Sequence, residues 1–158
     1  MKLDPVDLKI LSILQRDGRI TNFKLAKRIG LTPAPTLMRV KKLEEAGYIK
    51  RFVALVDPVK LGLPVVAFVH VILEAHNRKT TIDFVHAIQK FPEVLECHHI
   101  AGDEDFLLKV VAASPGEYEH FVLEKLTRVG GIEKVKTTFV LSSSKLETAI
   151  PVEGGLEK

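Results

Sequence analysis

The short turns that interrupt a helical pattern in the first fifty residues limit the possible folds of this chain more than any other sequence feature. One amphipathic segment ends at Gly18, and a second, capped by Thr21, ends at Gly30. A third helix is predicted to begin at Thr32 after a turn of only two residues, and Ala26 is small enough for close helix contact. Two short helices joined by such a turn are typical of a helix-turn-helix.

The third helix predicts which residues would meet a duplex. At about 100° per residue, a helix with Leu37, Val40 and Leu43 facing the bundle presents an uncharged N-terminal end and a basic middle. The short side chains are expected in a DNA groove and the cations on phosphates, although Arg39 could instead donate two hydrogen bonds to guanine. The alternative is a basic face on a protein-interaction helix pair. The predicted DNA-binding residues are Ala34, Pro35, Thr36 and Met38 for the groove, and Arg39, Lys41 and Lys42 for the phosphates.

The charge of the chain is unevenly distributed. The formal net charge is +3, from 23 basic and 20 acidic residues. Residues 1–51 hold twelve Lys and Arg against five Asp and Glu, a balance of +7, whereas the remainder has a balance of −4. A basic module joined to a mildly acidic one indicates that the first part meets a polyanion, and we expect double-stranded DNA.

The rest of the chain alternates between strands and helices. Strands are predicted over 65–74, 94–101, 105–113 and 132–142, and helices over 81–91 and 115–129; a short strand over 49–56 precedes them. The order β-α-β-β-α-β is that of a ferredoxin-like fold, so the whole chain is predicted to be α+β. The predicted domains are 1–51 (three-helix helix-turn-helix), 52–64 (strand and linker), 65–142 (ferredoxin-like, effector-binding and oligomerisation) and 143–158 (tail).

The strand over 65–73 is apolar on both faces. Val65, Val69 and Val71 alternate with Val66 and Phe68. Two helices can cover only one side of the sheet, so the other side is predicted to pack on a second subunit, most simply in a two-fold dimer. Coverage by the first domain or by the C-terminal tail is the alternative.

Several function classes have little support. The single Cys97 excludes a disulfide framework and fits a reducing cytoplasm, and the longest apolar run, 65–69, is far too short to span a membrane. Cys97 and His99 share one strand face, with His70 across the sheet, but two such ligands without a flanking motif are a weak metal site. The acids at 103–105 have no catalytic partners. Neither an enzyme, a metal site nor a cofactor is predicted.

Several runs of residues, in order and along nearly the whole chain, resemble the leucine-responsive/asparagine-regulator (Lrp/AsnC) family of prokaryotic transcription factors. They are Leu3-Asp4-x-x-Asp7-x-x-Ile10-Leu11, Leu25-Ala26-x-x-Ile29-Gly30-Leu31-Thr32, Arg39-Val40-x-x-Leu43-Glu44-x-x-Gly47-Tyr48-Ile49 and Gly102-Asp103-x-Asp105-Phe106. The resemblance implies a sequence-specific regulator whose dimers assemble into tetramers or octamers, and an amino-acid effector that alters assembly. An architectural DNA-binding protein with weak sequence preference and no effector is the alternative.

The resemblance also implies an effector site, because in this family the pocket lies between dimers. A carboxylate can accept from the ammonium of an amino acid, while a hydroxyl and free backbone N–H groups can bind its carboxylate. Two positions depart from the family pattern. The family usually has a small or aromatic residue where Glu104 stands, and often Tyr where Phe106 stands. A plain β-hairpin turn is the alternative. The implied effector residues are Ala101, Gly102, Asp103, Glu104, Asp105, Thr137, Thr138 and Val140.

Overall fold

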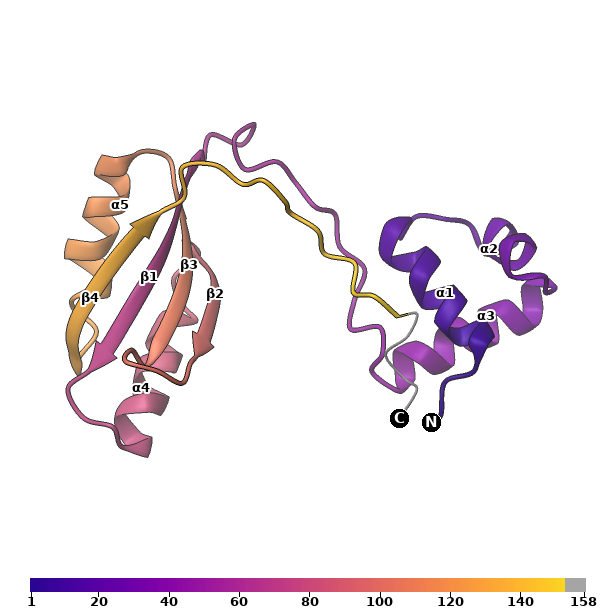
Figure 1. The fold of residues 1–158 in the computed structure, drawn as a ribbon, viewed down its shortest axis with the longest axis horizontal. Coiled ribbons are helices and arrows are strands. Elements are labelled where there is room, and N and C mark those ends of the chain that lie inside the picture. The colour runs from indigo at the N-terminus through magenta and orange to yellow at the C-terminus, as the bar shows by residue number, and fades with distance from the viewer. Residues whose placement is uncertain (153–158) are drawn as a thin grey trace. The chain divides into compact units, whose positions relative to one another are not determined.

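The structure divides into two units, which are described separately. In the computed structural model, residues 1–152 are described (Figure 1). The first unit contains Met1–Leu55 together with the described residues from Lys145 onward, and the second contains Val56–Ser144. The segment 145–152, assigned from sequence to a separate tail, therefore belongs with the helical unit; the last part of that tail lies outside the described residues. None of the described helices is long and apolar enough to cross a membrane.

Three helices form the first unit: α1 (Pro5–Arg16), α2 (Asn22–Ile29) and α3 (Pro33–Glu45). Asp4 caps α1 in a reciprocal capping box, since its carboxylate accepts from the N–H of Asp7 and the Asp7 carboxylate accepts from the N–H of Asp4. Gly30 ends α2 in the left-handed region at φ 77°. The core of this unit contains Ile10, Leu11, Leu25, Ile29 and Leu43.

The C-terminal segment is held against the first unit by the side chain of Gln15. Its amide nitrogen donates to the carbonyl of Ile150 at 3.0 Å, and its amide oxygen accepts from the N–H of the same residue at 2.6 Å. Val152 packs against the helical core. Gln15 thus binds the backbone of one residue in the way a neighbouring strand would.

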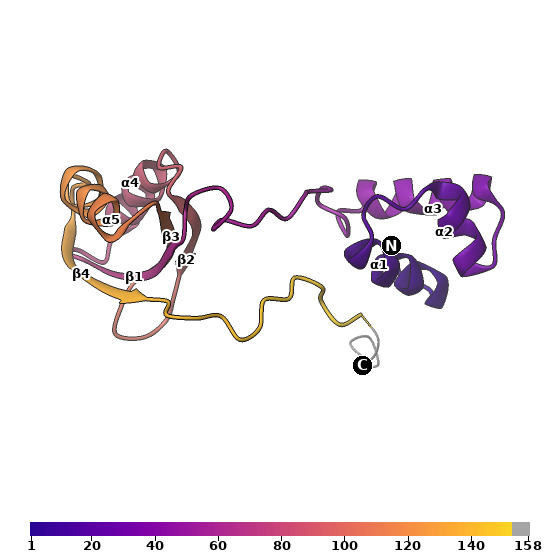
Figure 2. The same cartoon turned by 90° about the horizontal axis from the view of Figure 1, so that it is seen from above.

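The second unit has the predicted ferredoxin-like topology. An antiparallel sheet in the order β2-β3-β1-β4 is covered on one face by helices (Figure 2). The helix α5 continues as a short π-helical turn, η1, where the sequence predicts one regular helix to 129. The elements are β1 (Val65–Leu73), α4 (Arg78–Ile88), β2 (Val94–His99), β3 (Phe106–Ala112), α5 (Pro115–Phe121), η1 (Val122–Leu126) and β4 (Ile132–Phe139).

One predicted boundary and one predicted strand differ from the structure, each for an identifiable reason. Helix α4 starts at Arg78 and not at 81, because the Asn77 side chain accepts from the N–H of Thr80 and caps the earlier turn. The strand predicted over 49–56 does not form: this segment pairs with no other part of the described chain. A segment with strand propensity is a β-strand only when a partner supplies the ladder hydrogen bonds.

The two faces of β1 differ in burial, although both are apolar in sequence. Ala67, Val69 and Val71 are fully buried beneath the helices. The opposite side chains, including Phe68 and His70, are only partly buried. We call this second side of the sheet the open face; it also includes Leu107 of β3 and Thr138 of β4, which pair with His70 and Phe68.

Candidate nucleic-acid interface and effector site

The turn between α2 and α3 has the geometry of a helix-turn-helix. The N–H of Leu31 donates to the carbonyl of Ala26 at 3.0 Å, which closes the end of α2. The Asn22 side chain at the start of α2 donates to the carbonyl of Pro33 at 2.8 Å. The first turn of α2 is therefore tied to the first turn of α3, and the orientation of α3 is set by both ends of α2.

The outer face of α3 contains most of the residues predicted to bind DNA. Ala34, Pro35, Met38, Lys41 and Lys42 are all exposed. The exposed positions are uncharged at the N-terminal end and basic at Lys41 and Lys42, and the last turn carries the exposed acids Glu44 and Glu45.

Two positions of α3 were assigned to the wrong side. Thr36, predicted in the groove, is fully buried, and its hydroxyl donates to the carbonyl of Thr32 at 2.9 Å. Leu37, predicted in the core, is 46% exposed. A threonine that satisfies its hydroxyl within its own helix can be buried like an apolar residue, so hydrophobicity alone misplaced the inward face. The spacing of Leu37 from Ala34 and Met38 is the signal that could have placed it outside.

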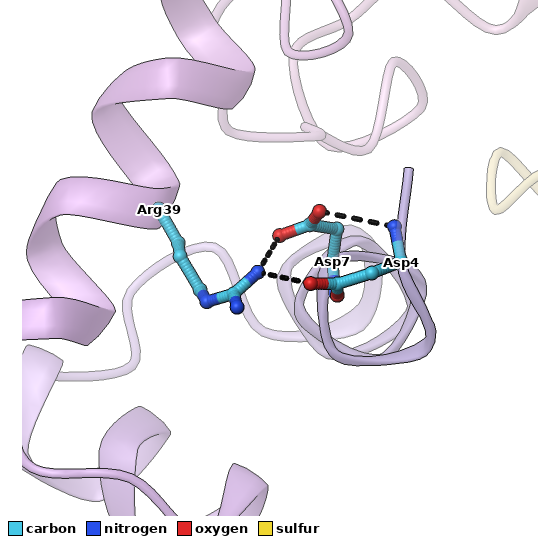
Figure 3. Close-up of polar contacts among 3 residues, drawn as sticks. All are labelled: Asp4, Asp7 and Arg39. Atoms are coloured by element: carbon cyan, nitrogen blue, oxygen red, sulfur yellow. Dashed lines mark hydrogen bonds and ion pairs between the residues drawn. The ribbon is translucent and has the colours of Figure 1, made fainter. Parts of the chain in front are cut away.

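Arg39 joins α3 to the start of α1 and is not a free cation (Figure 3). Its Nη1 donates to Oδ2 of Asp4 and to Oδ1 of Asp7, both at 2.7 Å. The N–H of Asp7 and the guanidinium of Arg39 lower the pKa of the Asp4 carboxyl below its ordinary value. The prediction that Arg39 contacts phosphate or guanine conflicts with this geometry, because both carboxylates belong to its own bundle. We assign Arg39 to positioning α3.

The predicted effector loop is the hairpin connection between β2 and β3. The N–H of Ile100 donates to the carbonyl of Asp105 at 2.9 Å, and Ala101, Gly102 and Asp103 are exposed. Asp105 already has partners: its Oδ2 accepts from the N–H of Leu73 at 2.8 Å and its Oδ1 lies 3.0 Å from Nδ1 of His76. Within this loop, Asp103 is the exposed carboxylate.

Glu104 lies above the open face of the sheet. Its Oε1 is 3.7 Å from Nδ1 of His70 and 3.7 Å from Nζ of Lys136. The Nδ1 atom of His70 is buried and makes no hydrogen bond within the described chain. Glu104 therefore connects the loop to the open face through its ion pair with Lys136 and its proximity to His70, and not by a hydrogen bond.

The predicted residues of β4 point to opposite faces. Thr137 pairs with the buried Val69, and its hydroxyl shares a 2.5 Å hydrogen bond with the Tyr118 hydroxyl beneath the helices. Burial raises the pKa of Tyr118. Thr138 is exposed on the open face. The two hydroxyls cannot meet one ligand on one face of the sheet, and Thr138 is the available one. Val140 donates its N–H to the carbonyl of Val66 at 2.9 Å.

The structure does not bring the three candidate metal ligands, Cys97, His99 and His70, to one face of the sheet. Cys97 and His99 face the helices, where Cys97 packs against the core and His99 stacks on Phe106. His70 lies on the opposite face of the sheet. Burial raises the pKa of the Cys97 thiol. No cluster of three His, Cys, Asp or Glu suited to a metal ion occurs within residues 1–152.

Two hollows in the chain lie away from the predicted effector loop. One of about 430 Å³ in the first unit is lined mainly by apolar side chains of α1, residues 48–52 and residues 150–152. Another of about 630 Å³ is lined by residues of α4, η1 and the segment 128–131, among them Asp83, Lys125 and Arg128. Neither is lined by residues 101–105.

The matches of the two units to known families define the class of protein as a DNA-binding regulator with a ligand-binding domain. Residues 3–50 match the winged helix-turn-helix DNA-binding family, and residues 66–150 match the Lrp/AsnC ligand binding domain. The chain belongs to the Lrp/AsnC family of transcriptional regulators, as its sequence motifs predict.

Named relatives support the same assignment over nearly the whole chain. The transcriptional regulator AzlB of Bacillus subtilis is 40% identical over 96% of both chains. The leucine-responsive regulatory protein of Escherichia coli is 36% identical over 96% of this chain and 92% of its own. These relatives are named as regulators and not as enzymes.

Solved structures agree with the fold. A transcriptional regulator of Neisseria meningitidis, solved as a complex with L-Met, has a TM-score of 0.92 at 36% identity and covers 96% of this chain and 98% of its own. AsnC of Escherichia coli has a TM-score of 0.86 at 27% identity, covering 94% and 98%.

Proposed function

We propose that this chain is a sequence-specific regulator of transcription that reads duplex DNA with the exposed face of α3. The observation that carries the proposal is the exposure of the N-terminal half of α3 together with Lys41 and Lys42, on a module with a formal charge of +7. Phosphates attract the cations, and the helix end is narrow enough to enter a major groove. Arg39 ties this helix to the start of α1 through its ion pairs with Asp4 and Asp7.

We propose further that a free amino acid or a related small molecule binds at the loop 101–105. Asp103 offers an exposed carboxylate to an ammonium group, and the exposed hydroxyl of Thr138 can donate to a carboxylate. The similar regulator of Neisseria meningitidis was solved as a complex with L-Met, which supports an amino acid as the class of ligand. Glu104 favours a ligand with basic or polar groups, because a purely apolar one would take water from its carboxylate without replacing it.

The proposed assembly is a homodimer through the open face, with further association into tetramers or octamers. Phe68 and Leu107 leave part of their apolar surface uncovered in the single chain, and burying it would stabilise a symmetric contact. A ligand that binds one assembly more tightly than another would shift the equilibrium between them. The spacing of DNA-binding units would then depend on effector concentration.

A salt-dependent gel shift with competitor DNA tests the proposed DNA readout. A strong preference for one pseudo-palindromic duplex is expected. Equal binding to all duplexes would instead favour an architectural protein without an effector, and no binding to any duplex would refute the assignment of α3. The Lys41→Ala variant provides the internal check, because its salt slope should fall by about 0.9 for each phosphate that Lys41 neutralises.

A thermal-shift screen of the twenty amino acids, followed by light-scattering mass, tests the effector site. The ligand identified should raise the melting temperature and change the mass of the assembly. Asp103→Ala should abolish both responses, while Asp83→Ala, an exposed aspartate on α4, should leave both intact. An unaltered response in Asp103→Ala would move the site away from the loop.

Substitution on the open face tests the dimer. Phe68→Glu places a charge in the proposed contact and should reduce the mass from a dimer or larger to a monomer. Leu123→Glu, at a residue 57% exposed on η1, is the matched control and should keep the native mass. A native mass for Phe68→Glu would place the subunit contact elsewhere.

A further inference from the structure

The exposed face of α3 begins with an apolar stripe. Ala34, Leu37, Met38 and Lys41 follow one another at helical spacing, so they share one side of the helix. Leu37 and Met38 are 46% and 55% exposed. Two large apolar side chains side by side on a small basic module leave apolar surface in water unless something covers it.

The same end of α3 has few groups that could form hydrogen bonds with a ligand. Pro33 and Pro35 have no N–H. The N–H and the hydroxyl of Thr36 both donate to the carbonyl of Thr32. The side chains of Leu37 and Met38 offer at most the weak acceptor of a thioether. This half of the helix is therefore poorly suited to reading base edges by hydrogen bonds.

One group in the major groove is recognised by apolar contact, the C5-methyl of thymine. We propose that Leu37 and Met38 read thymine methyl groups, so that the half-site carries A·T pairs where these two side chains lie. The inference rests on the proposed function, since it takes α3 as the recognition helix. It adds the class of base that the helix selects and the two side chains that select it.

The charge around the stripe favours a duplex over a protein partner. Lys41 continues the stripe, Lys42 lies beside it, and both are exposed. Methyl groups lie inside the major groove and phosphates line its edges, so apolar side chains followed by two lysines match both parts of the duplex. The exposed acids Glu44 and Glu45 of the last turn must then lie away from the phosphates. Arg39 is not counted here, because it is paired with Asp4 and Asp7.

Deoxyuridine scanning tests the inference with the full-length chain. A preferred duplex is first selected from a random pool, and each thymine of its half-site is then replaced singly by deoxyuridine, which removes only the methyl group. One or two positions in each half-site should lose about three- to tenfold in affinity, the range expected for exposing one buried methyl group. The remaining thymines should change little.

Variants then assign the effect to the side chains. In Leu37→Ala and Met38→Ala, the ratio of affinities for thymine and deoxyuridine at the sensitive positions should fall to about one. Leu123→Ala, at a leucine of the second unit that is 57% exposed, should keep the wild-type ratio. Both positions in α3 are exposed, so these variants should remain folded.

Three results would overturn the inference. A selected duplex that binds normally, with every thymine insensitive to loss of its methyl group, would refute methyl readout and leave the proposed function standing. Variants at Leu37 and Met38 that lower the mass of the assembly without changing the thymine ratio would assign the stripe to a protein contact. Failure to bind any duplex would refute the proposed function itself and, with it, this inference.

Discussion

Replacing Arg39 by alanine removes the cation that joins the middle of α3 to the start of α1. Asp7 is 3% exposed, and without Arg39 its carboxylate keeps only the N–H of Asp4 at 3.1 Å. Removing one partner of a buried charge pair costs about 3–5 kcal/mol, whereas a fully exposed pair contributes less than about 1 kcal/mol. Because the Arg39 side chain is 33% exposed, we expect the first unit to lose about 2 kcal/mol of unfolding free energy, between these limits.

Amide hydrogen exchange in the full-length chain measures this loss within the first unit. Protection of the α1 amides of Ile10 and Leu11 should fall by about 30-fold, since each 1.4 kcal/mol corresponds to about a factor of ten. The amide of Val69 in the second unit is the internal control. A double-mutant cycle with Asp7→Ala isolates the pair, and effects that add to within about 0.5 kcal/mol would refute the coupling.

The same variant separates a positioning residue from a phosphate contact. Arg39→Ala should weaken DNA binding because α3 is less firmly held, while the dependence of log affinity on log salt keeps its wild-type slope. Lys41→Ala should lower that slope by about 0.9 for each phosphate that the lysine neutralises. If Arg39→Ala lowers the slope as Lys41→Ala does, Arg39 contacts phosphate and its ion pairs with Asp4 and Asp7 rearrange in the complex.

Smaller effects are expected at three other contacts. The N–H of Asp7 lowers the pKa of the Asp4 carboxyl below its ordinary value of 3.8. The ionised carboxylate therefore stabilises the fold above pH 3.8, and this stabilisation is lost as the pH falls below that value. Asp4→Asn should reduce this acid dependence in a pH titration of unfolding. Gln15→Ala should accelerate exchange of the Ile150 amide by about tenfold, the factor for one lost hydrogen bond, and unchanged exchange would show that other contacts hold the C-terminal segment. Cys97 should react slowly with thiol reagents at neutral pH, because burial raises its pKa; rapid reaction would contradict its packing.

Local signals in the sequence predicted the helices and turns of the first unit, but they could not predict its long-range pairs. Thr21 and Gly30 act on atoms within a few residues, so capping chemistry predicted α2 and its turn. The partners of Arg39 lie 32 and 35 residues away along the chain, and no periodicity in α3 reveals them. A cation on an amphipathic helix looks the same whether it faces water or a buried carboxylate.

In the second unit, too, local patterns were predictable from the sequence and contacts between distant elements were not. Alternation in β1 predicted two apolar faces, one beneath the helices and one left for another cover, because a strand has a period of two residues; which face is buried beneath the helices came only from the structure. The roles within the loop depended on register: Asp105 accepts from Leu73 and Thr137 meets Tyr118, contacts that bring together elements far apart in sequence. The loop could therefore be predicted from its motif, and the free carboxylate within it could not.

A group that contributes to both effector binding and assembly is one direct way to link them. Glu104 is such a group, since it belongs to the loop and its carboxylate lies 3.7 Å from His70 and from Lys136 on the open face. A ligand that drew Glu104 toward its own cationic group would leave two basic side chains without their carboxylate on the proposed subunit contact. That rearrangement would give the ligand different affinities for the assembled and dissociated forms, which linkage requires. Glu104→Gln should then reduce the effect of the ligand on mass more than it reduces ligand binding, and an equal reduction in both would show that the coupling runs through other residues.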